Sequence, residues 1–160
     1  MNYHMRRKDK EITDSSEMKY ILEKTLYVTL AMTVEDMPYL VTLSHGYDSK
    51  KNCIYFHSAG EGKKLDYLRS NPKVWGQAIL DLGYDMGECN HHYASVMFRG
   101  VTSFVEDEGE KWEILADMTH KLEIDPKRLI ETRSKKAVMG TIVGRIDINH
   151  MTGKKTKEFR

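Results

Sequence analysis

Alternating hydrophobic and polar residues mark three β-strands in the first part of the chain. From 25 to 32 every second residue is apolar, so one face of a strand would be hydrophobic. The same two-residue period returns over 39–47 after the turn VEDMP, and the two segments together predict a hairpin. A third run of β-formers, CIYFHS at 53–58, follows the turn YDSKKN and completes a predicted three-strand meander.

The hydrophobic period changes to that of a helix in three segments. Two leucines three residues apart predict a short helix over 62–70, which an Asn-Pro pair ends because proline disfavours helical geometry in the residue before it. Apolar residues at helical spacing predict an amphipathic helix over 108–125. An Asp-Pro pair then has the N-cap and first-turn proline of a second short helix, which ends near 131.

Strand patterns return at 73–82, at 93–107 after a loop over 83–92, and at 137–149. Gly100 lies in the middle of the longest of these strands and predicts a bulge or bend. Short turns and peripheral helices disfavour a parallel doubly wound sheet. The predicted fold class is therefore mainly β (α+β), a six-stranded antiparallel barrel or half-barrel with a few short peripheral helices, in which closure removes exposed edges.

Length and composition fit a single globular domain over 1–160. The chain is 40% hydrophobic and 31% charged with a net charge of +1, which gives no general reason to bind nucleic acid. Basic residues gather at about 1–10 and 153–160, and we expect solvated tails there. No apolar run reaches the roughly 18 residues that span a bilayer, and no signal peptide is evident. We therefore expect a cytoplasmic protein with no membrane partner, in which Cys53 and Cys89 are reduced.

The junction between the third strand and the first helix has the composition of an anion-binding turn. Gly60 and Gly62 would let a ligand approach the backbone where the helix leaves its first N–H groups unpaired. Lys63 and Lys64 follow in the first helical turn, where cations oppose the helix dipole unless an anion lies between them. The alternative is that both lysines simply extend into water. Two side chains just before the turn could add a ring nitrogen and a hydroxyl: His57 and Ser58.

Four segments of the chain have a specific order and spacing: MRRKDKEITD, PYLVTLSHGYD, IYFHSAGEGKKLDYLRSNPKV and YASVMFRGVTSFVEDEGEK. Together they resemble the nitroimidazole-resistance branch of the pyridoxamine 5'-phosphate oxidase-like family, from Met5 to about Gly153. The resemblance implies a split β-barrel that forms a homodimer, with flavin mononucleotide (FMN) in clefts between the subunits. On this basis we expect an oxidoreductase that passes electrons from a reduced nicotinamide, NAD(P)H, to a small-molecule electron acceptor such as a nitro compound or quinone.

The resemblance also implies which residues hold the cofactor. Lys63 and Lys64 would meet the flavin phosphate, helped by Ser58 and the N–H groups of the turn, and His57 could tune the flavin by its charge. The second strand would offer backbone groups to the polar edge of the isoalloxazine, through Val41, Thr42, Leu43 and Ser44. The other expected contacts come from later strands, the last three from the partner subunit: Gln77, Tyr93, Ser95 and Arg99.

The chain departs from the family pattern in two places. Its end, NHMTGKKTKEFR, lacks the arginine- and tryptophan-bearing segment with which pyridoxamine phosphate oxidases hold their vitamer, so we do not expect vitamin B6 oxidation. Thr42 stands where many relatives in the resistance branch have proline. The alternative function is a non-catalytic flavin-binding or haem-handling protein, with His57 and His120 as candidate haem ligands.

A cluster of thiol and imidazole side chains lies between the two longest predicted strands. Cys89, His91 and His92 have the chemistry of zinc ligands, but their spacing matches no standard structural zinc site. Adjacent histidines in a strand would also point to opposite faces. A polar surface or dimer-rim loop is therefore the favoured interpretation, and we expect no metal site. No side chain has a context that identifies a catalytic acid, base or nucleophile.

Overall fold

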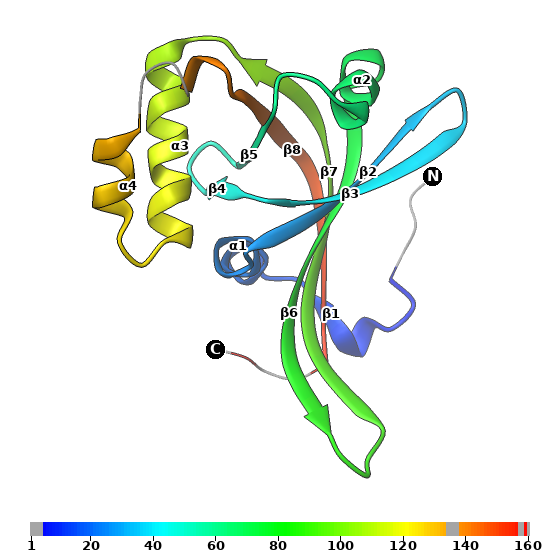
Figure 1. Cartoon of the computed structure of the whole chain (residues 1–160). Helices are drawn as coiled ribbons and strands as arrows, with labels where there is room; N and C mark the ends of the chain where they lie inside the picture. Colours follow the sequence, from blue (N-terminus) through cyan, green and yellow to red (C-terminus); the bar gives the residue numbers. More distant parts are fainter. Residues whose placement is uncertain (1–4, 134–137, 157–158, 160) are drawn as a thin grey trace.

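A computed structural model describes residues 5–133, 138–156 and 159 of the chain (Figure 1). Among these residues, eight strands form one antiparallel sheet in the order β3-β2-β6-β7-β8-β5-β4, and β1 pairs with β8 at one side. The strands are β1 (Glu11–Ile12), β2 (Tyr27–Val34), β3 (Met37–Ser44), β4 (Gly46–Asp48), β5 (Cys53–Ser58), β6 (Lys73–Asp85), β7 (Asn90–Val105) and β8 (Ile142–Lys155).

The helices lie around the sheet, as Figure 1 shows. Helix α1 contacts β6 and β7, α2 contacts β2, and α3 contacts α4 and β4. None of the helices in the described part of the chain is long and apolar enough to cross a membrane. The helical elements are η1 (Lys8–Lys10), α1 (Ser15–Lys24), α2 (Lys63–Ser70), α3 (Glu108–Leu122) and α4 (Pro126–Thr132).

The predicted mainly β fold is confirmed, with the six expected strands supplemented by the short β1 and β4. The predicted hairpin is β2–β3, which runs in continuous register from Tyr27 opposite Ser44 to Val34 opposite Met37. The predicted meander is confirmed only at its corner, because β5 pairs with β4 (the end of the predicted second strand) and with β8, and does not pair with β3. The chain bends at His45, which divides the predicted strand 39–47 between β3 and β4. These two strands lie at opposite ends of the strand order. This bend curls the sheet into a barrel that stays split.

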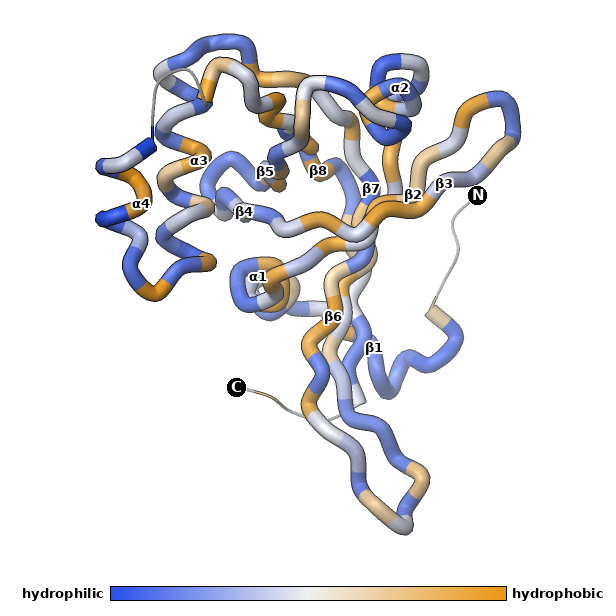
Figure 2. The backbone as a smooth tube through the Cα atoms, in the orientation of Figure 1, coloured by the Kyte–Doolittle hydropathy of each residue, from blue (hydrophilic) through white to orange (hydrophobic). Residues whose placement is uncertain are grey.

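The β6–β7 hairpin is longer than the sequence pattern indicated. Both strands continue into the expected loop, so only residues 86–89 connect them, and Figure 1 shows the hairpin extending away from the body of the barrel. Figure 2 shows that hydrophobic and hydrophilic residues keep alternating along this hairpin. The predicted irregularity at Gly100 is confirmed, since the pairing of β7 with β8 shifts between Arg99 and Gly100. A Cβ atom at Gly100 would lie 2.5 Å from the carbonyl oxygen of Asp147.

The last strand differs from its predicted bounds at both ends. It begins at Ile142 and continues to Lys155, so the expected basic tail from 153 is in part a strand. Gly153 is buried and pairs with Ile12 and Val96, which explains why this segment is held in the sheet. Lys155 forms a 2.8 Å ion pair with Glu17 of α1, and both side chains are largely buried.

Helix α1 was not predicted, although its sequence carries the usual signals. Asp14 caps it by accepting a hydrogen bond from the Ser16 N–H at 2.8 Å. Met18, Ile21 and Leu22 recur at helical spacing and are buried in the main core. The helix therefore forms because one apolar face closes the barrel beside β6 and β7.

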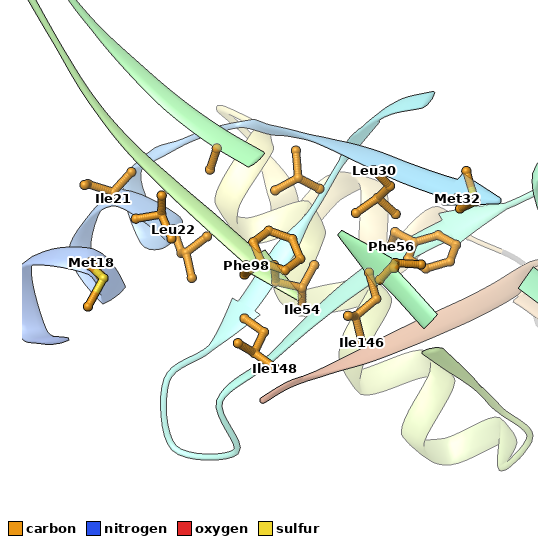
Figure 3. Packing of buried hydrophobic residues seen from close by; sticks show 14 of the residues in the cluster. Met18, Ile21, Leu22, Leu30, Met32, Ile54, Phe56, Phe98, Ile146 and Ile148 are labelled. Atoms are coloured by element: carbon orange, nitrogen blue, oxygen red, sulfur yellow. The ribbon is translucent and has the colours of Figure 1, made fainter. Parts of the chain in front are cut away.

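Two phenylalanines fill the centre of the core, as Figure 3 shows. Phe98 lies opposite Gly76 across β6 and β7, and Phe56 lies opposite Gly144 across β5 and β8. A Cβ atom on either glycine would come within 2.1 Å of the facing ring, so the missing side chain provides the space that the ring occupies. Buried aliphatic side chains from α1, β2, β5 and β8 surround the rings.

Candidate functional site

Helix α2 begins with backbone groups that are open to a ligand. It starts at Lys63 after Gly62, whose φ of 137° is rarely adopted by other residues. Gly62 provides no side-chain cap, so the first N–H groups of the helix lack the partner that a capping residue would give them. A Cβ atom added at Gly60 or Gly62 would meet no atom within 4 Å. The backbone of this turn is therefore accessible.

Ser58, the last residue of β5, supplies an unsatisfied polar group close to this turn in the chain. Its side chain is buried, and its Oγ atom has no hydrogen-bond partner among the residues that the structure describes. Leaving a buried hydroxyl without a partner costs about 1–3 kcal/mol. A ligand that hydrogen-bonds this hydroxyl would remove the penalty.

The two lysines of the turn differ in their surroundings. The Lys63 ammonium lies 4.7 Å from the centre of the Tyr39 ring and 5.5 Å from that of Tyr67, and the two rings lie 5.2 Å apart. Lys63 is exposed, and its cation–π contacts with Tyr39 and Tyr67 join α2 to β3. Lys64 is half-buried. The first turn of α2 is thus a cationic corner next to β3.

Strand β3 presents a backbone edge beside this corner. It lies at the end of the strand order and pairs with β2 alone among the described strands, so its other edge has no strand partner. Val41 and Leu43 pack against the core. Thr42 and Ser44 point to the opposite face, where the Thr42 hydroxyl lies 3.0 Å from that of Thr29. The predicted segment 41–44 therefore offers peptide groups at its edge and two hydroxyls on its outer face.

The remaining predicted site residues lie on the outer face of the same sheet. Gln77 lies opposite Thr29 on one side and Met97 on the other, which places it in a row with Thr42. A cavity of about 520 Å³ on this face brings together Gln77, Tyr93 and Ser95, whereas Arg99 lies outside its lining. The structure therefore forms two groups, one at the α2 corner and the β3 edge, the other on β6 and β7.

Large apolar side chains are exposed on this outer face. Monomeric proteins rarely leave a broad apolar surface in water, and such a patch usually marks an interaction site. We define the outer-face patch by the exposed apolar residues of β2, β3, β6 and β7 that share this side of the sheet: Tyr27, Leu40, Trp75, Ile79, Met97 and Val101.

His57 points away from Ser58, as the alternation of side chains along β5 requires. It shares a face with Cys53 and Tyr55, as predicted, and it lines a cavity of about 250 Å³ between β5 and the helices α3 and α4. Burial lowers the pKa of His57, and the positive charges of Arg133 and Lys64 lower it further. His57 is therefore neutral at pH 7 and belongs to a cavity of its own.

The two imidazoles near the β6–β7 turn each lie against a carboxylate. His91 lies 3.2 Å from the carboxylate of Asp81, and His92 lies 2.5 Å from that of Asp85. Cys89 is exposed, with a free thiol. In the described ranges no group of three or more His, Cys, Asp or Glu side chains could hold a metal ion. The other candidate haem ligand, His120, is exposed on α3.

A buried histidine holds the bend between β3 and β4, and the sequence reasoning missed it. His45 is fully buried, and its Nε2–H group donates to the Leu22 carbonyl at 2.9 Å. Its Nδ1 atom has no partner among the described residues. The Lys121 ammonium donates to the His45 carbonyl at 3.2 Å. Burial and the Lys121 charge lower the pKa of His45 to about 4, and burial lowers the pKa of Lys121 to about 8.

Comparison with known proteins matches residues 14–155 to the family described as pyridoxamine 5'-phosphate oxidase. A candidate 5-nitroimidazole antibiotic resistance protein from Bacteroides thetaiotaomicron has a similar structure, with a TM-score of 0.78, 25% identity and 96% of each chain covered. No curated protein sequence matches the chain.

Two further solved structures share the fold at lower identity. The flavocytochrome Anf3 from Azotobacter vinelandii has a TM-score of 0.80 and 18% identity, covering 98% of this chain and 73% of its own. An FAD- and haem-binding protein from Mycobacterium smegmatis has a TM-score of 0.76 and 16% identity, covering 94% of this chain and 75% of its own.

Proposed function

We propose that this chain, which belongs to the pyridoxamine 5'-phosphate oxidase family, is an FMN-binding oxidoreductase. Its similarity to a candidate nitroimidazole-resistance protein supports the branch that its motifs predicted. The observation that carries the proposal is the corner formed by the end of β5 and the start of α2. The end of β5 contributes a buried hydroxyl without a described partner, and the start of α2 contributes uncapped N–H groups and two lysines. These groups fit a phosphate, which accepts hydrogen bonds and carries negative charge.

The proposed site holds the two ends of the flavin with different groups. The phosphate lies with Ser58, Lys63, Lys64 and the first N–H groups of α2, while the ring system runs along the free edge of β3. Peptide groups of residues 41–44 bind its polar edge. The Lys63 ammonium lies 4.7 Å from the centre of the Tyr39 ring, so the phosphate corner and β3 are neighbours. The side chain of His57 is not included, because it lines the other cavity.

A bound flavin supplies hydride acceptance and one-electron chemistry, so the protein needs no acid–base triad of its own. The residues of this chain bind the phosphate, orient the ring and exclude water from it. The proposed electron donor is NAD(P)H, and the proposed acceptor is a small electron-poor molecule such as a nitro compound or quinone. We also propose a cytoplasmic location, in keeping with the two free thiols of the chain.

We propose that two copies of the chain associate through the outer-face patch and that each flavin lies between them. The patch adjoins Gln77, Tyr93 and Ser95, so a partner subunit on this face would add these polar groups, together with Arg99, to the second side of the cleft. This arrangement explains why the predicted site residues form two separate groups within a single chain.

Placing a charge in the middle of the outer-face patch should separate the subunits. Ile79→Glu buries an unpaired carboxylate at the proposed interface, so light scattering should give about the monomer mass of 18.6 kDa instead of twice that value. Ile124→Glu is the matched control, because Ile124 is fully exposed beyond the end of α3 and should leave the dimer intact. A wild-type protein that is monomeric with flavin bound would contradict the two-subunit cleft.

The proposed function is tested with the purified protein and added FMN. We expect yellow protein whose flavin absorbance bleaches under NADH without oxygen and recovers when a nitroaromatic compound or a quinone is added. Flavin that binds but does not bleach with NADH or NADPH would support the non-catalytic alternative. An intense haem absorbance without flavin would favour the haem-handling alternative, which two structural neighbours make worth measuring.

A further inference from the structure

The cavity beside His57 has no part in the proposed flavin site. It measures about 250 Å³ and lies between α3, α4 and the strand β5. Most of its wall is apolar, and the indole of Trp112 on α3 is the largest ring in it. His57 and Ser58 point to opposite faces of β5, so the cavity and the α2 corner are separated by the strand itself. A ligand can therefore bind in the cavity whether or not the α2 corner is occupied.

The polar groups of the cavity are mainly cationic or hydrogen-bond donors. Arg133, directly after α4, lines the cavity together with the neutral imidazole of His57. Glu123, at the end of α3, is the one acidic residue in the described lining. No ion pair joins Arg133 to Glu123 among the described residues, so the guanidinium is available to a carboxylate ligand.

The apolar wall and the cationic group together restrict what the cavity can hold. Small-molecule sites are typically apolar clefts with a few polar groups that fix orientation, and a guanidinium can bind a carboxylate through two parallel hydrogen bonds. We propose that this cavity is a second small-molecule site, which binds a small aromatic molecule with a single carboxylate. Arg133 and His57 hold the carboxylate, and the ring lies against Trp112 and the aliphatic side chains of α3 and α4.

Trp112 provides a direct measurement of binding. The chain has two tryptophans, and Trp75, on β6, lies outside the lining of this cavity, so a Trp75→Phe variant identifies the indole N–H signal of Trp112 in ¹H–¹⁵N NMR spectra of the full-length protein. Benzoate should shift this signal saturably, with or without FMN present. Benzamide, which has the same ring without the charge, should bind at least tenfold more weakly.

Variants of the cavity test the assignment of each part. Arg133→Met should weaken benzoate binding at least tenfold, whereas Arg128→Met, an exposed position on α4, should leave it unchanged. Ala116→Phe fills the cavity from α3 and should abolish binding while Arg133 stays in place. The dispersion of the NMR spectrum shows whether each variant is folded.

The proposal is overturned if the Trp112 signal does not move with benzoate, if Arg133→Met binds as well as the wild type, or if Ala116→Phe still binds. Its failure is distinct from a failure of the proposed function. Benzoate binding is measured without a reductant or an electron acceptor, and FMN binding is measured by the absorbance of the flavin itself.

Discussion

Replacing Lys63 and Lys64 together with alanine should weaken FMN binding at least tenfold, or by about 1.4 kcal/mol or more. The two ammonium groups lie at the start of α2, where their positive charge opposes the helix dipole. A bound phosphate would remove this repulsion, because its negative charge attracts both the ammonium groups and the positive end of the dipole. Charge-assisted hydrogen bonds to phosphate are among the stronger polar contacts in proteins, so their loss should be visible in affinity. Quenching of FMN fluorescence on titration with protein measures the change.

Riboflavin separates a phosphate contact from a general loss of the site. It carries the same ring without the phosphate, so wild type and double variant should bind it equally. The Lys50→Ala/Lys51→Ala variant, in the exposed turn before β5, removes the same charge elsewhere and should keep FMN affinity. An equal loss of FMN and riboflavin affinity would instead assign the lysines to the packing of Tyr39 and Tyr67, which Lys63 contacts.

The local elements of this fold were predictable because their signals are local. The β2–β3 hairpin follows from a two-residue period on both sides of a short turn, and Glu35 and Asp36 in that turn have the positive φ values that tight hairpins need. The start of α4 follows from Asp125, whose carboxylate accepts from the Arg128 N–H. Gly100 indicated the bulge for a similar reason, since the close approach of Asp147 excludes a side chain.

Features that depend on contacts between distant segments were not predictable in this way. The bend at His45 interrupts a pattern that reads as one strand, because the two halves find different partners in the sheet. The β6–β7 strands continue through residues with weak strand preference, since pairing across the hairpin stabilises them. Arg133 and His57 line one cavity only because α4 packs against α3, and no spacing in the sequence reports that arrangement.

The site was predicted with Tyr93, Ser95 and Arg99 on the partner's side of a cleft, and the structure divides the predicted residues of one chain into two groups. The α2 corner could be recognised because its glycines and lysines are consecutive. Gln77 and Ser95 lie on the outer face of β6 and β7, which we propose is covered by a second subunit. His57 was grouped with Ser58 because the two are neighbours in the chain, although strand alternation places their side chains on opposite sides.

Acidification should destabilise this protein through His45, by about 3 kcal/mol between neutral pH and pH 4. The unfolded chain binds a proton at His45 near its ordinary pKa of 6.5, whereas burial and the Lys121 ammonium hold the folded-state pKa at about 4. Between these values the unfolded state carries more protons, so the free energy of unfolding falls as the pH falls. Each pH unit in this window is worth about 1.4 kcal/mol.

Other groups titrate in the same range, so the His45 contribution is measured as a difference. His45→Gln keeps a donor for the Leu22 carbonyl but cannot titrate, and the gap in unfolding free energy between wild type and this variant should shrink by about 2–3 kcal/mol from pH 7 to pH 4.5. His120→Gln, on the exposed face of α3, should show no such change. Lys121 stays charged in both states across this range, because its folded-state pKa is about 8. A gap that is constant with pH would mean that His45 is not held neutral at the bend. The bend at His45 directly follows β3, whose edge belongs to the proposed flavin site. Lowering the pH from 7 to 4.5 should therefore also weaken FMN binding more in the wild type than in His45→Gln.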